Sequence, residues 1–437
     1  MGNRRVRVMW SDLNGLAHGR YVPESRLDQH GHHAVTTLTM NIARDILPIE
    51  GYSGDVGFPD MSTVPLPETR RPGWEVDTDV AIADLEFHHE PLVIAPRTAL
   101  KTAVEAWQAL GYEPLLGFEM EFYLMEPNVD APGGYGPLTI PSHRVYGTGL
   151  GGDTTGVMFD LYDAAERSEL DLEGMMGEFH PGQMELNMRY GPALDAADRA
   201  FICKEMNREV AARRGYLLTY MGRPIAEYVG SGLHINFSLV PATGGANAFD
   251  APDAEHGIST LARQCIGGLI AHHEALGAFS APLINSYKRL MPGVIAGYWA
   301  NWGLDNRTST YRVPGQRGEA TRIENRMPCG SASPYLAAAV MLNAARLGFE
   351  AGLDCGTPQA GDGDCEPNTD RHTPLTLADA LDALEANDSI CAEMGPDLVR
   401  AYVAIRRDEV SRWEAAGLDW SVESISPWEL EQYLPFY

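Results

Sequence analysis

Residues 117–124 have the sequence Gly117-Phe118-Glu119-Met120-Glu121-Phe122-Tyr123-Leu124, in which apolar and acidic side chains alternate. Successive side chains of a β-strand point to opposite faces of a sheet, so residues two apart share one face. The pattern therefore predicts a strand with one apolar face and with two carboxylates, Glu119 and Glu121, on the other. Such neighbours stand about 7 Å apart, which suits two metal ions better than chelation of one.

Three further stretches place polar groups on one face of a predicted strand. Their polar members are Gln183, Glu185 and Asn187; His234, Asn236 and Ser238; and Arg322, Glu324 and Arg326. Together with Glu178, the stretches supply six side chains of the kind that binds metals: Glu119, Glu121, Glu178, Glu185, His234 and Glu324. Carboxylates packed this densely repel one another and raise each other's pKa unless cations neutralise them.

This ligand set is typical of hard divalent cations. Mg²⁺ and Mn²⁺ prefer carboxylate oxygens with an occasional imidazole, and they keep open positions for phosphate oxygens and water. We therefore expect two or three such ions in a site that handles phosphate. A single Glu-x-Glu pair is usually only the solvated face of an edge strand, but four such stretches in one chain argue against that alternative.

Arginines form the second half of the predicted site, namely Arg289, Arg307, Arg312, Arg322 and Arg326. A guanidinium binds a carboxylate or phosphate through two parallel hydrogen bonds, and several of them near metal ions stabilise charge on a transferring phosphoryl group. A lone arginine is more often part of a surface ion pair. Arg322 and Arg326 differ because they flank Glu324 on the same predicted strand face, and we expect them to share its cleft.

The composition argues against several kinds of partner. The chain has 437 residues, 44% of them hydrophobic, and a formal net charge of −27. It can bury a large core but offers no general basic surface for nucleic acid. Its six cysteines lack CxxC spacing, which is typical of reduced thiols, and no apolar run approaches the roughly 20 residues that span a bilayer. We predict a cytoplasmic protein without nucleic-acid or membrane partners.

The sequence changes character near residue 95. Before it, short strand-like pieces such as 6–10 and 80–84 lie among turn signals, which indicates a small α+β domain. After it, helical patterns alternate with strands, and we predict a mostly antiparallel sheet with helices at 97–110, 195–214, 258–277, 334–352, 376–386 and 397–415. Segments 127–156 and 355–374 are predicted loops. The first lacks a Walker lysine, so a surface loop is favoured over a phosphate cradle.

The order of these motifs resembles the glutamine synthetase superfamily through nearly the whole chain. The matching segments are Glu-x-Glu-Phe at 119–122, Glu with Gly-Gln-x-Glu at 178–185, Gly-Ser-Gly-x-His at 230–234, Asn-Ser-Tyr-Lys-Arg-x-x-Pro-Gly at 285–293, Asn-Arg at 306–307 and Arg-x-Glu-x-Arg-x-Pro at 322–328. The resemblance implies a small β-grasp domain over residues 1–95 and a large catalytic domain over residues 96–437. It also implies a homo-dodecamer of two hexameric rings, with active sites between neighbouring subunits.

The resemblance further implies roles for single residues. The metal ion nearer glutamate would be held by Glu121, Glu178 and Glu185, and the ion on the nucleotide phosphates by Glu119, His234 and Glu324. Glutamate would be bound by Arg289, Arg326 and Gly230. The nucleotide and acyl phosphates would be steadied by Arg307, Arg312 and Arg322. Near the nucleotide we also expect Ser238 and Asn236, the latter in place of a histidine that is common in the family.

The residues expected to bind the nitrogen substrate differ from those of the family. True glutamine synthetases carry a glutamate in Pro-Gly-x-Glu, which closes the site and takes a proton from ammonium, whereas this chain has Ile295. Isoleucine cannot accept a proton, but it can line a pocket for an alkyl or aryl group. Trp302 lies in a segment that resembles glutamate–amine ligases and would line the amine pocket, although a core role is at least as probable for any one aromatic. Asp55 matches a retained aspartate, and Asn41 falls where the family has an ammonium-binding one.

The sequence thus predicts an ATP-dependent ligase that joins the γ-carboxylate of L-glutamate to an organic amine through γ-glutamyl phosphate. Its candidate catalytic residues are Arg307, Arg326 and Asp55, and the amine's proton would go to Asp55 from a neighbouring subunit, to Glu178 or to water. Two alternatives are an ordinary glutamine synthetase that uses ammonia and a non-catalytic relative that binds nucleotide or glutamate. The amine stays open between polyamines, which need acidic residues at the pocket mouth, and alkyl or aryl amines, which need apolar ones.

Overall fold

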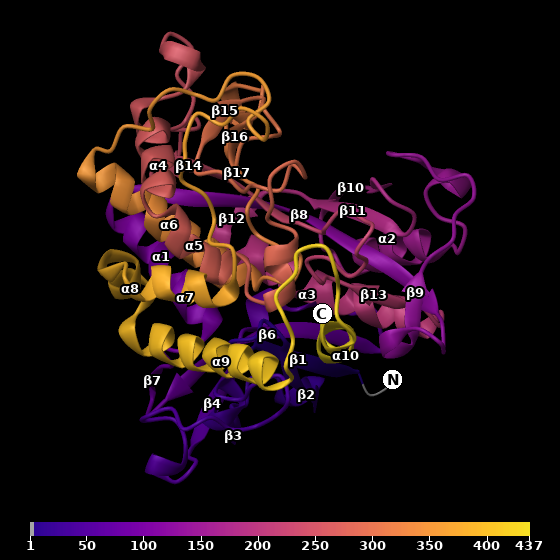
Figure 1. The fold of residues 1–437 in the computed structure, drawn as a ribbon. Coiled ribbons are helices and arrows are strands. Elements are labelled where there is room, and N and C mark those ends of the chain that lie inside the picture. Colours follow the sequence, from indigo (N-terminus) through magenta and orange to yellow (C-terminus); the bar gives the residue numbers. More distant parts are fainter. Residues whose placement is uncertain (1–3) are drawn as a thin grey trace.

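Two β-sheets and ten α-helices make up the fold of residues 4–437, the part of the chain that the computed structural model describes (Figure 1). The sheets contain seven and ten strands, and almost all neighbouring strands are antiparallel. Helices α1 and α3 pack directly against β8, the long strand at the centre of the larger sheet. The predicted α+β class is therefore confirmed.

The smaller sheet, indigo in Figure 1, is formed by the first strands of the chain. Its order is β2-β1-β6-β4-β3, with β5 and β7 also paired to β6, and only β1 and β6 run parallel. The strands are β1 (Arg5–Ser11), β2 (Ala17–Pro23), β3 (Gly31–Ala34), β4 (Asp60–Pro65), β5 (Arg71–Pro72), β6 (Thr78–Phe87) and β7 (Glu90–Pro91). Both strand-like segments predicted here, 6–10 and 80–84, are strands.

The larger sheet contains all the predicted ligand strands. Its order is β10-β11-β8-β14-β17-β16-β15, with β9, β12 and β13 also paired to β8. The strands are β8 (Tyr112–Pro127), β9 (Tyr135–Pro137), β10 (Leu172–Gly177), β11 (Gln183–Met188), β12 (Gly191–Pro192), β13 (Leu217–Thr219), β14 (Leu233–Pro241), β15 (Trp302–Leu304), β16 (Tyr311–Val313) and β17 (Ile323–Asn325). Residues 117–124 therefore lie in the middle of the sheet, in β8.

Most predicted helices are present, with one correction. The helices are α1 (Pro96–Ala109), α2 (Val157–Arg167), α3 (Ala193–Arg213), α4 (Thr260–Ala271), α5 (His273–Ser280), α6 (Pro334–Ala351), α7 (Leu377–Glu385), α8 (Asp388–Met394), α9 (Pro396–Ala415) and α10 (Pro427–Tyr433). The single helix predicted over 258–277 is wrong, because the backbone at His272 (φ −105°, ψ 12°) separates α4 from α5. Helices α2, α8 and α10 were not predicted.

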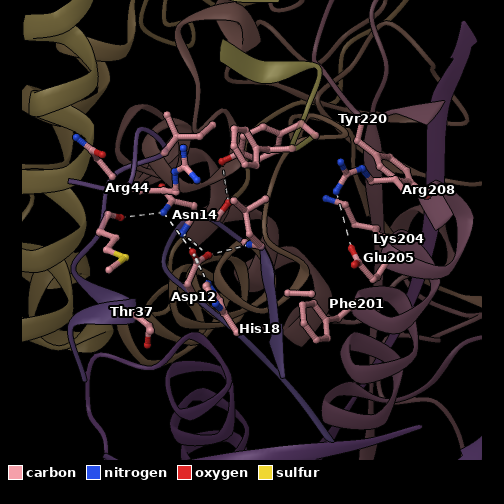
Figure 2. A pocket seen from close by; sticks show the side chains of 18 residues that line it. Asp12, Asn14, His18, Thr37, Arg44, Phe201, Lys204, Glu205, Arg208 and Tyr220 are labelled. Carbon is pink, nitrogen blue, oxygen red and sulfur yellow. Dashed lines mark hydrogen bonds and ion pairs between the residues drawn. The ribbon is translucent and has the colours of Figure 1, made fainter. Parts of the chain in front are cut away.

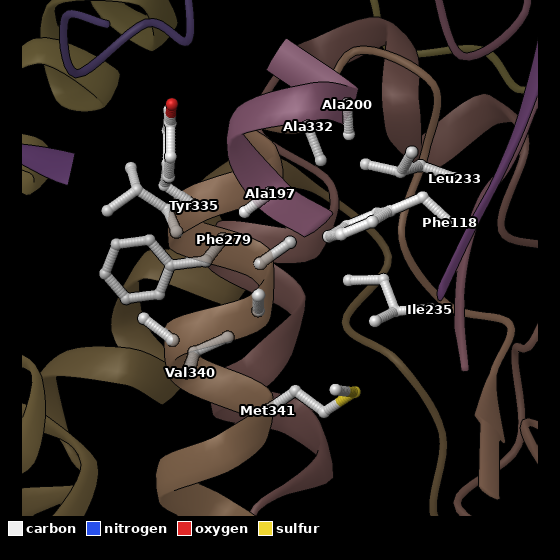
Figure 3. Close-up of a cluster of buried hydrophobic side chains, with 14 of the residues drawn as sticks. Phe118, Ala197, Ala200, Leu233, Ile235, Phe279, Ala332, Tyr335, Val340 and Met341 are labelled. Carbon is white, nitrogen blue, oxygen red and sulfur yellow. The ribbon is translucent and has the colours of Figure 1, made fainter. Parts of the chain in front are cut away.

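The apolar halves of the alternating strands form the core between the large sheet and the helices. Figure 3 shows Phe118 of β8 beside Leu233 and Ile235 of β14, facing Ala197 of α3 and Met341 of α6. All five side chains are at most 1% exposed. Because this face is fully buried, a shift of one residue in any strand would turn its apolar side chains to the opposite face. The same constraint fixes the positions of the polar side chains.

The first sheet ends at Pro91 and α1 begins at Pro96, close to the predicted boundary at residue 95. One hydrophobic cluster nevertheless continues from Trp10 and Ile82 of the first sheet to Trp107 of α1. The division into two domains therefore stays a prediction. Among the described residues, no helix is long and apolar enough to cross a membrane.

Candidate active site

The register of the larger sheet brings the predicted metal ligands together on neighbouring strands. Glu121 of β8 lies opposite Glu185 of β11, and Glu119 of β8 lies opposite His234 of β14. Glu324 lies on β17, which is the neighbour of β14 on its other side. Directly opposed residues of an antiparallel pair have Cβ atoms about 5 Å apart. The five ligands therefore form one continuous row across four strands, which we call the metal row.

Three members of the metal row have the spacing of a metal site. Ligand atoms of Glu119, His234 and Glu324 all lie within 4.8 Å of one another. His234 Nδ1 is 3.3 Å from Glu119 Oε2 and 4.0 Å from Glu324 Oε1, and the side-chain amide of Asn236 donates to Glu119 Oε1 at 2.8 Å. These are the three residues that the sequence assigned to the nucleotide-side ion.

The predicted ligands of the other metal ion, Glu121, Glu178 and Glu185, form a second triad that is crowded with negative charge. Burial, followed by the charge of Glu121, raises the pKa of Glu178 to about 7. The same two causes, with contributions from Glu119 and Glu178, raise the pKa of Glu185 to about 8. The chain itself therefore supplies too little positive charge to offset the burial and mutual repulsion of these carboxylates. Divalent cations would provide it.

The charge of Glu119 is balanced differently. Burial acts to raise its pKa, but the hydrogen bond and charge of His234, the Asn236 amide and the charge of Arg326 together lower it to about 2. Glu119 therefore keeps its charge through neighbours in the chain, in contrast to Glu178 and Glu185. The two predicted metal positions thus have distinct electrostatic surroundings.

Two arginines bind the carboxylate of Glu324, which is only 1% exposed. Arg312 Nη1 donates to Glu324 Oε2 at 2.7 Å, and Arg326 donates to the other oxygen. Arg312 also donates to Asp305 at 2.6 Å, a contact that the sequence did not predict. A buried carboxylate needs such partners, because an unpaired charge in the interior is strongly destabilising. Arg312, predicted for phosphate, and Arg326, predicted for glutamate, are thus both held at the metal row.

A cavity of about 400 Å³, which we call the catalytic cavity, contains most of the predicted site. It is lined by the predicted residues Glu119, Glu121, Glu178, Glu185, Gly230, His234, Arg289, Ile295, Arg307 and Arg326, and also by Tyr146, Phe179, Gln183, Val229, Gly293, Val294 and Ala296. Acidic metal ligands and basic side chains thus face one space. Such a space can hold a small anion between cations and arginines.

A second cavity of about 380 Å³, the nucleotide-side cavity, shares Glu119 with the first. The predicted residues Asn236, Ser238 and Arg322 line it, together with Asn187. Arg322 Nε donates to the side-chain oxygen of Asn236 at 2.8 Å, which places a guanidinium next to the metal row. The structure therefore places Asn236, Ser238 and Arg322 in one cavity and the predicted glutamate residues Arg289, Arg326 and Gly230 in the other, and Glu119 lines both.

Gly230 and Arg289 lie side by side at the catalytic cavity. A Cβ atom at position 230 would lie 2.4 Å from the Gly222 carbonyl oxygen and 2.6 Å from Arg289 Cγ, so only glycine fits there. Arg289 is 3% exposed and donates to the main-chain oxygens of Met327 and Arg326 at 2.9 and 3.2 Å. These bonds fix the position of Arg289, which lines the cavity beside Arg326.

The mouth of the catalytic cavity is apolar. Tyr146, Phe179 and Ile295 line it and have 56%, 55% and 46% of their surfaces exposed. Large apolar side chains in water at the edge of a cavity are typical of a binding surface. Sequence reasoning found Ile295 but missed the two aromatic residues. Phe179 follows the predicted metal ligand Glu178 directly, and Tyr146 lies in the segment predicted to be an ordinary surface loop.

Two predicted site residues lie elsewhere in this chain. Trp302 is 1% exposed in β15, and its indole donates to the Gly356 carbonyl at 3.2 Å, so the amine-pocket role predicted for it is wrong and the core role applies. Asp55 lies on an exposed turn of residues 54–56 and lines neither cavity. Its carboxylate accepts hydrogen bonds from the main-chain N–H groups of Gly51 and Ser53, which come just before this turn. A catalytic role for Asp55 would require a neighbouring subunit.

A third cavity, of about 270 Å³, lies apart from the other two and shares no lining residue with them (Figure 2). Most of its charged side chains already have partners in the chain. His18 lies 3.1 Å from Asp12, and Lys204 donates to the carbonyls of Gly330 and Ala332. Asn41 lines this cavity and donates to Asp408 at 2.7 Å.

The geometry agrees with the result of a comparison with protein families. Residues 93–433 match the family model described as the glutamine synthetase catalytic domain. The chain belongs to the glutamine synthetase family. This membership confirms the resemblance seen in the motifs, and it establishes an ATP-dependent ligase that forms carbon–nitrogen bonds.

Relatives with different acceptors match this glutamine synthetase family member about equally well. The gamma-glutamylethanolamide synthetase of Streptomyces coelicolor is 31% identical over 433 residues, covering 95% of this chain and 91% of the relative. The glutamate–isopropylamine ligase of a Pseudomonas species is 29% identical, covering 87% and 82%. The glutamine synthetase of Methanosarcina mazei is 31% identical, covering 78% and 74%. A solved GmaS/ADP complex aligns with a TM-score of 0.84 at 28% identity, covering 99% and 97%.

The donor set fits the divalent metal ions that the glutamine synthetase family implies. Glu119, His234 and Glu324 supply oxygen and nitrogen donors within reach of one ion. The raised pKa values of Glu178 and Glu185 indicate carboxylates that lack compensating positive charge. Oxygen-rich sites with a single imidazole suit Mg²⁺ and Mn²⁺ better than they suit softer metals.

Proposed function

We propose that this member of the glutamine synthetase family joins the γ-carboxylate of L-glutamate to an organic amine. The observation that carries the proposal is the position of Ile295. It lies at the mouth of the same cavity that Arg326 and four members of the metal row line, where the family has a proton-accepting glutamate. The side chains that activate glutamate are present, whereas the carboxylate that favours ammonium is replaced by an apolar group.

Activation of glutamate would use both cavities. A carboxylate is a poor acyl donor in water, and transfer of a phosphoryl group from ATP would convert it to γ-glutamyl phosphate, with release of ADP. Bound Mg²⁺ or Mn²⁺, two or three ions per site, would neutralise charge on the phosphates during this step. We propose Glu121, Glu178 and Glu185 as ligands on the glutamate side, and Glu119, His234 and Glu324 on the nucleotide side.

Arginines would bind the anionic groups on either side of the metal row. Arg289 and Arg326 would hold the carboxylates of glutamate, with Gly230 allowing its close approach. Arg307, Arg312 and Arg322 would steady the transferring and nucleotide phosphates. Asn236 and Ser238, which line the nucleotide-side cavity, would contact the nucleotide. The relative that was solved as an ADP complex supports nucleotide binding by this fold.

The amine would enter through the apolar mouth and attack the acyl phosphate, releasing phosphate. Tyr146, Phe179 and Ile295 favour an alkyl or aryl amine over a polyamine, because every carboxylate that lines the cavity belongs to the metal ligands. Glu178 lines the same cavity as Ile295 and is the acceptor that we propose for the amine's proton. Asp55 would take part only from a neighbouring subunit of a dodecamer, an assembly that we propose along with a cytoplasmic location.

An amine panel tests the proposal. The purified protein would be given ATP, Mg²⁺ or Mn²⁺, glutamate and one of ammonia, methylamine, ethanolamine, isopropylamine, aniline or putrescine. Phosphate release and the mass of the γ-glutamylamide would be measured. We expect kcat/KM for the best alkyl or aryl amine to exceed that for ammonia by at least about tenfold. Ammonia as the best substrate would overturn the proposal.

An ordinary glutamine synthetase is the second candidate. The glutamine synthetase of Thermotoga maritima is 33% identical to this chain, as similar as the amine ligases are, so overall likeness does not separate the two functions. The local difference at Ile295 does separate them. The same panel decides, since this candidate requires ammonia to be preferred to every amine.

A further inference from the structure

The loop that carries Ile295 has an unusual backbone. Residues 293–297, which we call the acceptor loop, have positive φ angles at Gly293 (84°), Ile295 (55°) and Gly297 (76°). Glycine adopts such angles freely, but a β-branched residue does so at a cost and needs support from its surroundings. The conformation at Ile295 must therefore be held by contacts outside the acceptor loop.

Those contacts lie on both sides of Ile295. Its main-chain N–H donates to Asp364 Oδ2 at 3.0 Å, from a segment 69 residues away in the sequence. Its main-chain carbonyl accepts from Arg326 Nη2 at 3.4 Å. Arg326 also binds Glu324 of the metal row. The acceptor loop is thus held between Arg326, which lines the catalytic cavity, and Asp364.

Asp364 is itself fixed to the turn that carries Arg307. The Asn306 side chain donates to the Gly361 carbonyl at 2.8 Å, and the Gly363 N–H donates to Thr308 Oγ1 at 2.8 Å. Arg307 lies between Asn306 and Thr308 in the sequence, and it lines the catalytic cavity. The half-buried Asp364 therefore follows directly after residues 361–363, which are hydrogen-bonded to Asn306 and Thr308.

We propose that Asp364 is a positioning residue for the amine, because its carboxylate holds the acceptor loop so that Ile295 closes the mouth of the catalytic cavity. Asp364 does not line the cavity, so it acts through Ile295 and does not contact the amine. The inference rests on the proposed function for the nature of the acceptor. Loss of the Ile295 N–H contact would loosen the amine end of the cavity and leave the glutamate and nucleotide ends in place.

Three variants test this role. Asp364→Ala removes the carboxylate oxygen that accepts the hydrogen bond from the Ile295 N–H. Asp364→Asn removes the charge but keeps an oxygen that can accept this hydrogen bond. Glu366→Gln removes one negative charge from an exposed side chain of the same segment and is the matched control. The readouts are KM and kcat for the nitrogen substrate, glutamate and ATP, with the ratio of kcat/KM for the preferred amine over ammonia.

We expect Asp364→Ala to raise the KM of the nitrogen substrate by about three- to tenfold, as for the loss of one hydrogen bond, and to lower amine selectivity. The KM values for glutamate and ATP should change less than about twofold. Asp364→Asn and Glu366→Gln should stay close to the wild type. A structural role alone would change all three KM values together and would overturn the inference.

The inference would also be overturned by an unchanged KM for the nitrogen substrate in Asp364→Ala. If that variant does not fold, Asp364→Glu moves the carboxylate by one methylene and must raise the same KM. A wild-type protein that uses only ammonia would refute the proposed function alone. The role of Asp364 would then still be decided by the KM for ammonia.

Discussion

The metal row and the cavity mouth are built from different kinds of structure. The row lies on β8, β11, β14 and β17, where each ligand is fixed by sheet register and by buried partners such as Arg312. The mouth is formed by the exposed side chains of Tyr146, Phe179 and Ile295, which lie outside strands and helices. A rigid sheet thus carries most of the side chains that match the family's motifs, and loops carry the part that differs in this chain.

This contrast predicts that damage to the row abolishes turnover, whereas changes at the mouth redirect it. A substitution on a strand removes a ligand that no neighbour can replace. A substitution in the mouth changes only the shape and charge that an acceptor meets. Four experiments test this contrast, and their expected effects decrease from Glu324→Ala through Ile295→Glu and Phe179→Ala to a change of pH.

Glu324→Ala should have the largest effect. It removes a ligand of the nucleotide-side cluster and leaves Arg312 and Arg326 without their buried partner. We expect ADP formation at saturating substrates to fall by about 10²–10³-fold. Initial rates measured over a Mg²⁺ or Mn²⁺ titration would check this. Glu414→Ala, an exposed position on α9, is the control, and near-normal turnover in Glu324→Ala would refute the ligand assignment.

Ile295→Glu should redirect the acceptor without abolishing activity. It restores the type of side chain that the family uses with ammonium, so kcat/KM for ammonia relative to the best amine should rise by about tenfold or more. Competition between the two substrates, followed by mass spectrometry of the products, measures this ratio. Ile295→Leu keeps an apolar group of the same size and should preserve the original preference. An unchanged ratio in Ile295→Glu would mean that the mouth does not select the acceptor.

Phe179→Ala should affect bulky amines selectively. Removal of an exposed aromatic wall should lower kcat/KM for the larger alkyl and aryl amines by about three- to tenfold and leave that for methylamine nearly unchanged. Parallel kinetics with the two amine sizes test this. Phe159→Ala removes a similarly exposed ring on α2, away from both main cavities, and should have no effect. Equal losses for small and large amines would contradict an amine-binding role.

The crowded carboxylates predict a smaller effect of pH on stability. Burial and Glu121 raise the pKa of Glu178 to about 7 and of Glu185 to about 8, above the ordinary value of 4.5. Between about pH 4.5 and pH 8 these two carboxylates hold more protons in the folded metal-free protein than in the unfolded chain. The free energy of unfolding should therefore fall as pH rises through this range. Mg²⁺ or Mn²⁺ should oppose this loss and raise the thermal midpoint by about 2–5 °C near pH 8.

Thermal unfolding at pH 6 and pH 8.5, with a chelator or with metal, would measure this dependence. Glu185→Gln should weaken both the loss of stability at high pH and the stabilisation by metal. A metal-free midpoint that rises through this range would contradict the crowding of the second triad.

Much of the metal row could be predicted from the sequence, because strand alternation is a local property. Two glutamates separated by one apolar residue in β8 must share a face wherever the strand packs, and the apolar partners must face the core. The helices with strong 3.6-residue patterns, such as α1 and α6, were predicted to within two residues. The single helix over 258–277 was not, since its break at His272 has no glycine or proline to mark it.

The mouth of the catalytic cavity was harder to predict because it depends on contacts between segments that are distant in the sequence. Ile295 was found because a motif was broken there. Tyr146 and Phe179 had no local signal, and Trp302 was misplaced because aromatic residues in a pocket and in a core look the same in sequence. Nothing near Asp364 in the sequence indicates that it reaches Ile295, since the contact depends on how the turns around Arg307 fold.

The amino-acid sequence was enough for the family, for the six side chains predicted as metal ligands and for the changed residue at 295, since all three are recorded in local patterns and ordered motifs. Which ligands stand opposite one another, which aromatic residues form the mouth and which carboxylate holds the acceptor loop became known only from the folded chain. These features depend on register and on long-range packing. Both follow from the free energy of the whole core, and no short segment encodes them.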